Sequence, residues 1–334
     1  MLDRLRRRVA PGAVPLNRSF ANWAAVADPS VVQICHPEWR GVRASTYAFG
    51  DVVVETTDLT DAARPLAAEL IEAGAATVVV QAWVPGTEAL LHAASAAGLA
   101  TRMVFHSSMP QHGADHHEGE AVTRAFDLAD DGVIGRVGFV KDGLAEAFEA
   151  MGHHAWYLAN RVPRLPPFER EDLGDGLDVG VFQHPYWRKN VTTQLSAVAI
   201  LGGTAHIMAK PDVGYLSLPI VEYGELAHDR FIGLQASVDL NLVVSLSECY
   251  PMSPMESYAA GVPALVSRTS ALFASDPELY ALTTVGEADN PTAVAAAARA
   301  LFDHRDEAVE RAATWLAAAD DDAAERWATF VDPD

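Results

Sequence analysis

The chain has few cysteines and no long apolar run. Only Cys35 and Cys249 occur among its 334 residues. Their wide separation excludes a disulfide framework and fits a reducing cytoplasm. No run of 18 apolar residues is present, so we expect no transmembrane helix. The basic first residues, 1–8, lack the apolar segment of a secretory signal, and we expect a solvated leader on a cytoplasmic protein.

Bases are scarce relative to acids. The chain has 24 Lys and Arg against 45 Asp and Glu, which gives a net charge of −21. This field repels nucleic acid and anionic membrane surfaces. An anionic small-molecule ligand therefore needs a local cluster of cations.

Two nucleotide-binding fingerprints and a metal-ligand pattern are also missing. Neither a P-loop nor a G-x-G-x-x-G motif occurs, which disfavours a kinase and a simple dehydrogenase. Residues 115–118 carry metal-capable side chains, but four consecutive residues do not converge easily on one ion. We expect a solvated loop over 111–120, and neither a metal nor a cofactor.

The apolar pattern alternates between strand-like and helix-like segments. Such alternation predicts parallel, doubly wound sheets. In the first half the expected strands are 31–35, 51–55, 76–81, 101–105, 132–140 and 156–159, and the expected helices are 62–73, 87–97 and 142–151. In the second half the expected strands are 177–182, 204–209, 215–218, 240–246 and 264–267. The expected helices are 190–201, 227–236 and 292–329.

A proline-rich segment separates the two halves. Residues 163–177 hold three prolines and alternating charges, which is typical of an interdomain linker. We therefore predict two α/β domains, 1–163 and 164–334.

The most informative motif holds two carboxylates with seven residues between them, Glu248 and Glu256. The preceding strand must end by Pro251, which cannot donate to a strand ladder. This arrangement puts one acid at the carboxyl end of a strand and the other in the first turn of a helix. Open α/β sheets bind anions and polar ligands there.

A structural role for the second acid is an alternative. Ser253 suits an N-cap, Pro254 the first helical position and Glu256 the third. In such a capping box Glu256 only satisfies the N-cap amide.

The motif resembles the E-x7-E signature of retaining glycosyltransferases of the GT-B fold, family 4. The resemblance implies two Rossmann-like domains facing across a cleft, with an acceptor-side first domain, a nucleotide-sugar-binding second domain, and a final helix that often crosses back. It implies that Glu248 binds hydroxyls of the donor sugar and Glu256 the ribose hydroxyls. Pro251 and the amides of Met252 and Ser253 would line the sugar or diphosphate. Here Cys-Tyr-Pro replaces the family's usual aromatic-Gly step.

Two adjacent cations, Arg188 and Lys189, precede the expected helix 190–201. The forked guanidinium of an arginine and the ammonium of a lysine, placed beside the start of a helix, can neutralise a diphosphate. The resembling family uses an Arg and a Lys five residues apart, so the adjacency is a departure. A solvated pair of cations is the alternative.

Residues 218–224 resemble the family's base-binding loop. The resemblance implies that the backbone from Val221 to Tyr223 pairs with the nucleobase and that the Tyr223 ring stacks on it. A half-buried surface aromatic is the alternative.

In the first half, His106 stands at the end of a predicted strand, where the family often has a histidine facing the donor. It is a candidate to bind the sugar or phosphate or to assist the acceptor hydroxyl, and a core histidine is the alternative. The family has a glycine-rich turn near the acceptor after the first strand. The acceptor-side candidates there are His36, Trp39, Arg40, Gly41 and Arg43.

Together these features predict a metal-independent retaining glycosyltransferase that uses a nucleoside-diphosphate sugar, with UDP the preferred nucleotide. The acceptor hydroxyl is not identified by the sequence. Three alternatives stay open: a nucleotide-sugar 2-epimerase, a pseudo-glycosyltransferase that uses a cyclitol nucleotide, and a non-catalytic relative.

Overall fold

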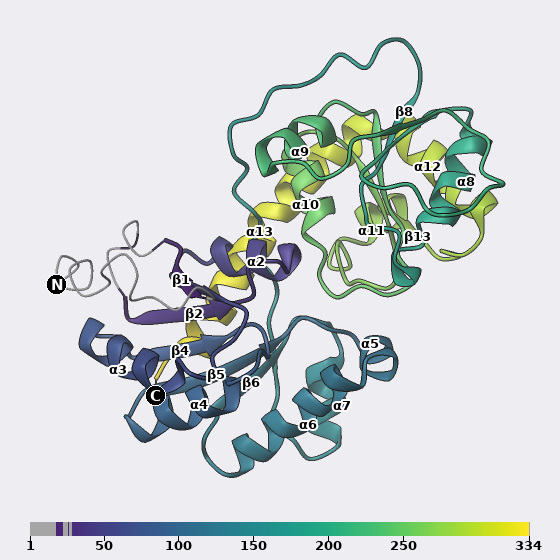
Figure 1. The fold of residues 1–334 in the computed structure, drawn as a ribbon. Helices are drawn as coiled ribbons and strands as arrows, with labels where there is room; N and C mark the ends of the chain where they lie inside the picture. The colour runs from purple at the N-terminus through teal and green to yellow at the C-terminus, as the bar shows by residue number, and fades with distance from the viewer. Residues whose placement is uncertain (1–17, 23–25, 27–28, 334) are drawn as a thin grey trace. The chain divides into compact units, whose positions relative to one another are not determined.

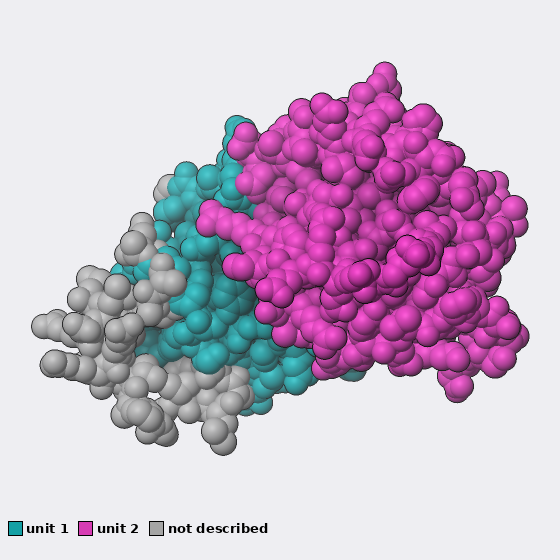
Figure 2. Space-filling model, turned by 90° about the horizontal axis from the view of Figure 1, so that it is seen from above, with its two compact units in different colours: residues 1–161, 322–334 teal, residues 162–321 magenta. Residues whose placement is uncertain are grey.

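The computed structural model describes residues 18–22, 26 and 29–333, so the basic segment 1–8 lies outside the described residues. The chain forms two compact units, coloured separately in Figure 2. Unit 1 comprises residues 1–161 and 322–334, and unit 2 comprises residues 162–321.

Unit 1 is built on a seven-stranded sheet in the order β1-β3-β2-β4-β5-β6-β7. Its strands are β1 (Arg18–Phe20), β2 (Val31–Cys35), β3 (Val52–Thr56), β4 (Thr77–Val80), β5 (Ala100–Phe105), β6 (Arg136–Phe139) and β7 (Trp156–Tyr157). Only β1 is antiparallel, to β3. The Val-rich runs of β3 and β4 are buried because helices cover both faces of a parallel sheet.

The helices of unit 1 connect successive strands (Figure 1). They are α2 (Arg40–Ala48), α3 (Ala63–Ala73), α4 (Thr87–Ala96), α5 (Met109–Ala114), α6 (His116–Asp130) and α7 (Leu144–Ala150). The sequence-based expectation of a loop over 111–120 is wrong. Asp115 caps α6 by accepting from the His117 amide at 3.0 Å, so the polar run is a helix start rather than a loop.

Unit 2 has a six-stranded sheet in the order β10-β9-β8-β11-β12-β13, and the neighbouring strands in this order are parallel to each other. The strands are β8 (Asp178–Val181), β9 (Thr204–Ile207), β10 (Ile220–Glu222), β11 (Leu240–Val243), β12 (Ala264–Ser267) and β13 (Thr284–Val285). The parallel, doubly wound architecture predicted for both halves is confirmed. The strand expected over 215–218 is wrong: Tyr215 is 72% exposed, and pairing with β9 begins only at Ile220.

The helices of unit 2 are α8 (Val191–Leu201), α9 (His228–Gln235), α10 (Met252–Ala259), α11 (Pro277–Thr283) and α12 (Pro291–Asp303), with a short 3₁₀ turn, η2 (Trp187–Lys189). The single helix expected over 292–329 is two helices. It breaks at His304, the C-cap of α12, and resumes as α13 (Arg305–Val331). No helix in the described part of the chain is long and apolar enough to cross a membrane.

The last turns of α13 belong to unit 1. Phe330 is fully buried there, and its ring approaches Gly138 so closely that an added Cβ would lie 3.1 Å from it. The Trp327 ring stacks on Phe49 with centroids 4.0 Å apart. The Thr77 hydroxyl donates to the Val331 carbonyl at 2.8 Å. The core of unit 1 therefore needs residues from both ends of the described chain.

Candidate functional site

The candidate site lies at the carboxyl edge of the unit 2 sheet. Strands β8 and β11 are parallel neighbours, so the segments that follow them emerge at the same edge. The Leu246 amide, after β11, donates to the Arg188 carbonyl, after β8, at 2.7 Å. This bond holds the two motif-bearing segments against each other.

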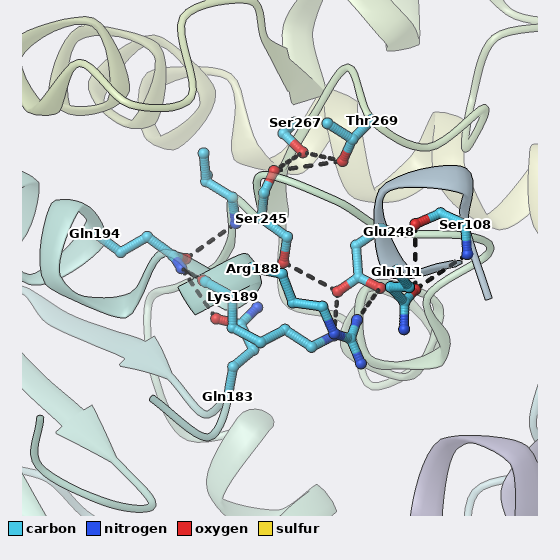
Figure 3. Close-up of polar contacts among 11 residues, drawn as sticks. Ser108, Gln111, Gln183, Arg188, Lys189, Gln194, Ser245, Glu248, Ser267 and Thr269 are labelled. Carbon is cyan, nitrogen blue, oxygen red and sulfur yellow. Dashed lines mark hydrogen bonds and ion pairs between the residues drawn. The ribbon is translucent and has the colours of Figure 1, made fainter. Parts of the chain in front are cut away.

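Glu248 is the centre of this cluster (Figure 3). It is 7% exposed and forms an ion pair with the Lys189 ammonium. One of its oxygens lies 3.8 Å from Arg188 Nη1, and the Ser245 hydroxyl donates to the other at 3.0 Å. The 3₁₀ turn η2 lets both adjacent cations face one carboxylate.

Two side chains that the sequence analysis missed hold this geometry. The Asn190 backbone has φ 55°, and its side-chain amide donates to the carbonyls of Val244 at 3.1 Å and Ala288 at 2.6 Å. The Gln194 amide donates to the Lys189 carbonyl at 2.8 Å and accepts from the Val244 amide at 3.0 Å. Asparagine tolerates the left-handed conformation, so an asparagine before a predicted helix is a signal that could have identified Asn190. No comparable pattern in the sequence identifies Gln194.

Glu256 is not the third residue of a capping box. Helix α10 begins at Met252 after Pro251, whose extended backbone (φ −68°, ψ 132°) makes it the N-cap. Ser253 is then the second helical residue, and its hydroxyl accepts from Gln235 Nε2 at 2.7 Å. The capping role considered for Ser253 is therefore wrong, because the helix starts earlier than proline statistics suggest.

The Glu256 carboxylate instead meets a histidine. Glu256 is 5% exposed, and its Oε1 lies 3.1 Å from His228 Nε2 at the start of α9. The His228 side chain is 52% exposed. The second acid of the motif is thus buried beside a half-exposed histidine.

The expected base-binding loop does not leave a strand at Leu218. Val221 lies within β10, and the Tyr223 amide donates to the Ile207 carbonyl at 3.0 Å, so the sheet uses this amide. The Tyr223 hydroxyl lies 2.7 Å from His206 Nδ1, whose Nε2 lies 2.7 Å from Asp178. The Tyr223 hydroxyl is therefore held by the buried pair of His206 and Asp178.

In unit 1, His106 directly follows β5. Its Nε2 lies 2.7 Å from Gln81 Oε1, and burial lowers its pKa to about 4. The imidazole is therefore neutral at physiological pH.

The acceptor-side candidates fall into two groups. The rings of His36 and Trp39 stack 4.9 Å apart. Arg43 forms an ion pair with Glu55 and lies 5.5 Å above the Tyr47 ring. Arg40, Gly41 and Arg43 all lie on α2, so a helix begins at the point where the resembling family has its glycine-rich turn. A Cβ at Gly41 would meet nothing within 4 Å.

Among residues 18–22, 26 and 29–333, no group of three or more His, Cys, Asp or Glu side chains is placed to hold a metal ion.

No family model and no curated protein matches this chain. Solved structures match it in fold. The apo structure of OtsA matches with a TM-score of 0.60 at 10% identity, over 90% of this chain and 98% of that one. The UDP-forming α,α-trehalose-phosphate synthase from Burkholderia xenovorans, in complex with glucose-6-phosphate, matches with 0.58 at 11% identity over the same shares.

The sucrose-phosphate synthase from Thermosynechococcus elongatus matches with a TM-score of 0.56 at 14% identity, over 86% of this chain and 96% of that one. At these identities the likeness concerns the fold. This chain has two Rossmann-like α/β units with parallel sheets, of the kind found in GT-B glycosyltransferases.

Proposed function

We propose that this chain is a retaining glycosyltransferase of family 4 that transfers a sugar from a UDP-sugar to an acceptor hydroxyl. The observation that carries the proposal is the cluster of Arg188, Lys189 and Glu248 at the carboxyl edge of β8 and β11. The likeness in fold to a UDP-forming synthase supports UDP as the leaving group.

The two cations serve the diphosphate. A chain with a net charge of −21 repels an anionic donor, so binding requires local positive charge. Arg188 and Lys189 are 27% and 20% exposed, which shields them from water while leaving them accessible. Partly desolvated cations interact more strongly with a phosphate than fully solvated ones.

Glu248 exchanges partners when the donor binds. Without ligand, its carboxylate neutralises both cations. The diphosphate takes these cations, and Glu248 is released to accept hydrogen bonds from hydroxyls of the donor sugar. The Ser245 hydroxyl keeps its carboxylate oriented.

Glu256 and the start of α10 hold the rest of the donor. Glu256 accepts from the ribose hydroxyls after these replace His228. The first amides of a helix have no partner within the helix, so those of Met252 and Ser253 donate to phosphate or sugar oxygens. Pro254, the third residue of α10, has no amide hydrogen to satisfy.

Transfer breaks the bond between the anomeric carbon and the β-phosphate oxygen of UDP. The acceptor oxygen forms its bond to the same face of that carbon, and its proton passes to the departing phosphate oxygen. Arg188 and Lys189 stabilise the charge on UDP, so the reaction proposed here uses no metal or other cofactor.

A thermal-shift series with UDP, GDP, ADP and dTDP tests the proposal. A ligand at 100 times its Kd adds about 2.7 kcal/mol of stability, so the preferred nucleotide gives a clear rise in Tm. We expect the largest rise with UDP. The absence of a shift with every nucleotide would refute the proposal.

Two variants separate the roles of the two acids. Glu256→Gln is expected to abolish the UDP shift. Glu248→Gln is expected to keep it but to lose UDP release from UDP-glucose, UDP-galactose and UDP-N-acetylglucosamine. Glu310→Gln, an exposed acid on α13, is the matched control and should change neither.

A further inference from the structure

We propose that the open edge of β7 is a docking site for an extended, arginine-rich segment of another protein, which adds to the seven-stranded sheet of unit 1 as one more strand. The proposal concerns unit 1 alone and goes beyond the proposed function. The site begins at the amino end of β7, whereas His36 and His106 follow the carboxyl ends of β2 and β5.

A groove in unit 1 has the shape that such a segment needs. A space of about 530 Å³ lies between the end of α7, the strand β7 and the helix α13. The helical wall is one face of α13, because its lining residues are spaced three and four positions apart. They are Asp322, Glu325, Arg326 and Thr329. The other two walls are the edge of β7 and the turn that leads into it.

One side of the β7 backbone has no partner strand. The Leu158 amide donates to the Phe139 carbonyl of β6 at 2.9 Å. In a parallel ladder alternate residues face the same neighbour, so the N–H and C=O of Tyr157 turn away from β6. Those of Ala155, two positions earlier, follow the same alternation. The backbone groups of these two residues form no hydrogen bond with any residue that the structure describes.

These unpaired groups are suited to a ligand that brings its own backbone. Ala155 and Tyr157 both line the groove, and Ala155 is only 8% exposed. Buried backbone N–H and C=O groups without a partner are rare in native proteins. An antiparallel strand would pair with both residues, because alternate residues of such a strand face the same neighbour. An open strand edge is a template for this kind of addition.

The carboxylates of the groove select a positively charged segment. Asp322 is already paired, since its Oδ2 lies 2.7 Å from Arg326 Nε. Glu149, at the end of α7, and Glu325 are not: neither carboxylate forms a hydrogen bond or an ion pair within the described part of the chain. Two uncompensated negative charges therefore line the groove on opposite walls. Cationic side chains of a partner would neutralise them.

The aromatic rings of β7 favour arginine over lysine. Arg136 lies 4.9 Å from the centre of the Trp156 ring, and Arg326 lies 5.2 Å from the centre of the Tyr157 ring. Successive side chains of a strand point to opposite faces of the sheet, so a guanidinium stacks on each face of this edge. A planar guanidinium on the added strand can stack in the same way, whereas an ammonium cannot.

Fluorescence polarisation with a labelled peptide of alternating arginine and valine tests the proposal. We expect saturable binding that weakens as salt is added. The same peptide with glutamate in place of arginine should not bind. Absence of binding by the arginine peptide at low salt would overturn the proposal.

Backbone N-methylation of the peptide separates strand pairing from charge. Only alternate residues of an added strand direct their N–H toward β7. We therefore expect methyl groups on one alternating set of residues to abolish binding and methyl groups on the other set to leave it nearly unchanged. Equal affinities of the two methylated peptides would show that the backbone of β7 takes no part.

Amide hydrogen exchange followed by NMR reads the strand edge directly. The Leu158 amide is already bonded to β6 and should exchange slowly with and without the peptide. The Tyr157 amide should exchange quickly in the free protein and roughly tenfold or more slowly in the complex. An unchanged rate at Tyr157 in the saturated complex would contradict strand addition.

Charge reversal tests the two free carboxylates. Glu149→Lys and Glu325→Lys should each weaken binding of the arginine peptide roughly tenfold, because an attraction becomes a repulsion. Glu310→Lys, at an exposed acid of α13 in unit 2, is the matched control and should change Kd little. An equal loss in the control would reveal non-specific attraction to an acidic chain and would overturn the proposal. Circular dichroism of each variant confirms that it is folded.

Three other occupants of the groove give different results, and each would replace the proposed partner. Spermidine that displaces the peptide at a similar concentration would assign the groove to a small organic cation. A dimer that dissociates when the peptide is added would assign it to a second copy of this chain. Tighter peptide binding after removal of residues 1–8 would assign it to the chain's own basic segment. Nucleotide binding enters none of these experiments, so they decide the matter whether or not the proposed function holds.

Discussion

Arg102 Nε lies 2.8 Å from the backbone carbonyl oxygen of Phe330, although 228 residues separate them in the sequence. Arg102 is 2% exposed, and it also donates to the carbonyls of Asp332 at 2.6 Å and Thr101 at 3.1 Å. Arg136 donates to the Thr329 and Phe330 carbonyls beside it. Two cations thus satisfy carbonyls at the negative end of α13.

Arg102→Met should destabilise unit 1. It removes a buried charge at the end of α13 and its three hydrogen bonds to carbonyl oxygens, which costs about 2–4 kcal/mol in the free energy of unfolding. Urea denaturation measures this loss. Arg124→Met is the matched control, because Arg124 pairs with Glu88 on the surface and its loss should cost much less than the loss of Arg102. Equal losses in the two variants would contradict the anchoring role.

Asp51 gives unit 1 a stability that depends on pH. Burial raises the pKa of Asp51 from 3.8 to about 6, against the opposing hydrogen bonds of Trp327 and Gln33 and the charge of Arg161. Between pH 4 and 6 the folded chain keeps a proton that the unfolded chain has lost. The contribution of Asp51 to stability is therefore present below pH 4 and falls as pH rises toward 6, by at most about 1.4 kcal/mol per pH unit.

Asp51→Asn tests this sign. Asparagine keeps an oxygen that accepts from Trp327 and Gln33 but carries no charge. Relative to the wild type, the variant should gain stability as pH rises from 4 to 6. The difference between their unfolding free energies at pH 4, 5, 6 and 7 isolates Asp51 from other titrating groups. A constant difference would refute the prediction.

Gly41→Ala should stabilise the protein. Gly41 is exposed on α2, and alanine is favoured over glycine in a helix by about 0.5–1 kcal/mol. Gly98→Ala is the contrast: space is also open there, but φ is +83°, so the same substitution should destabilise. Urea denaturation of both variants measures the difference. A loss of stability in Gly41→Ala would show that α2 needs a glycine at this position.

Lys189→Met should weaken UDP binding by roughly tenfold or more, because a charge-assisted hydrogen bond is lost. Isothermal titration calorimetry of UDP measures the effect. Lys210→Met, on an exposed residue of unit 2, is the control and should change Kd little. Similar affinities in the two variants would remove Lys189 from the proposed diphosphate site.

Much of the fold was predictable from local sequence. The strand predicted over 31–35 and that over 264–267 match β2 and β12 residue for residue. Both strands are buried and mostly apolar, because a parallel sheet is covered on both faces, and this leaves a strong signal in the sequence. The helix predicted over 62–73 ends at Ala73, as α3 does, and Gly74 follows it in the left-handed conformation.

The incorrect predictions share a physical cause, which is that a polar residue can cap a helix or bind a distant partner. Asp115 reads as part of a loop until its contact with the His117 amide is known. The capping role considered as the alternative for Glu256 could not be ruled out from local sequence, because its partner, His228, is 28 positions away. Gln194, Gln33 and Gln81 act through buried amide contacts that no local pattern encodes.

Helix α13 begins in unit 2 and ends in unit 1, so the order of synthesis on the ribosome determines when each unit can fold. Unit 2 is continuous along the chain and can assemble as soon as residue 321 has emerged. Unit 1, whose first 161 residues are made earliest, must wait for Trp327 and Phe330 before its core closes. The part translated first is therefore the part completed last, and its nascent form exposes the apolar surface that invites chaperones.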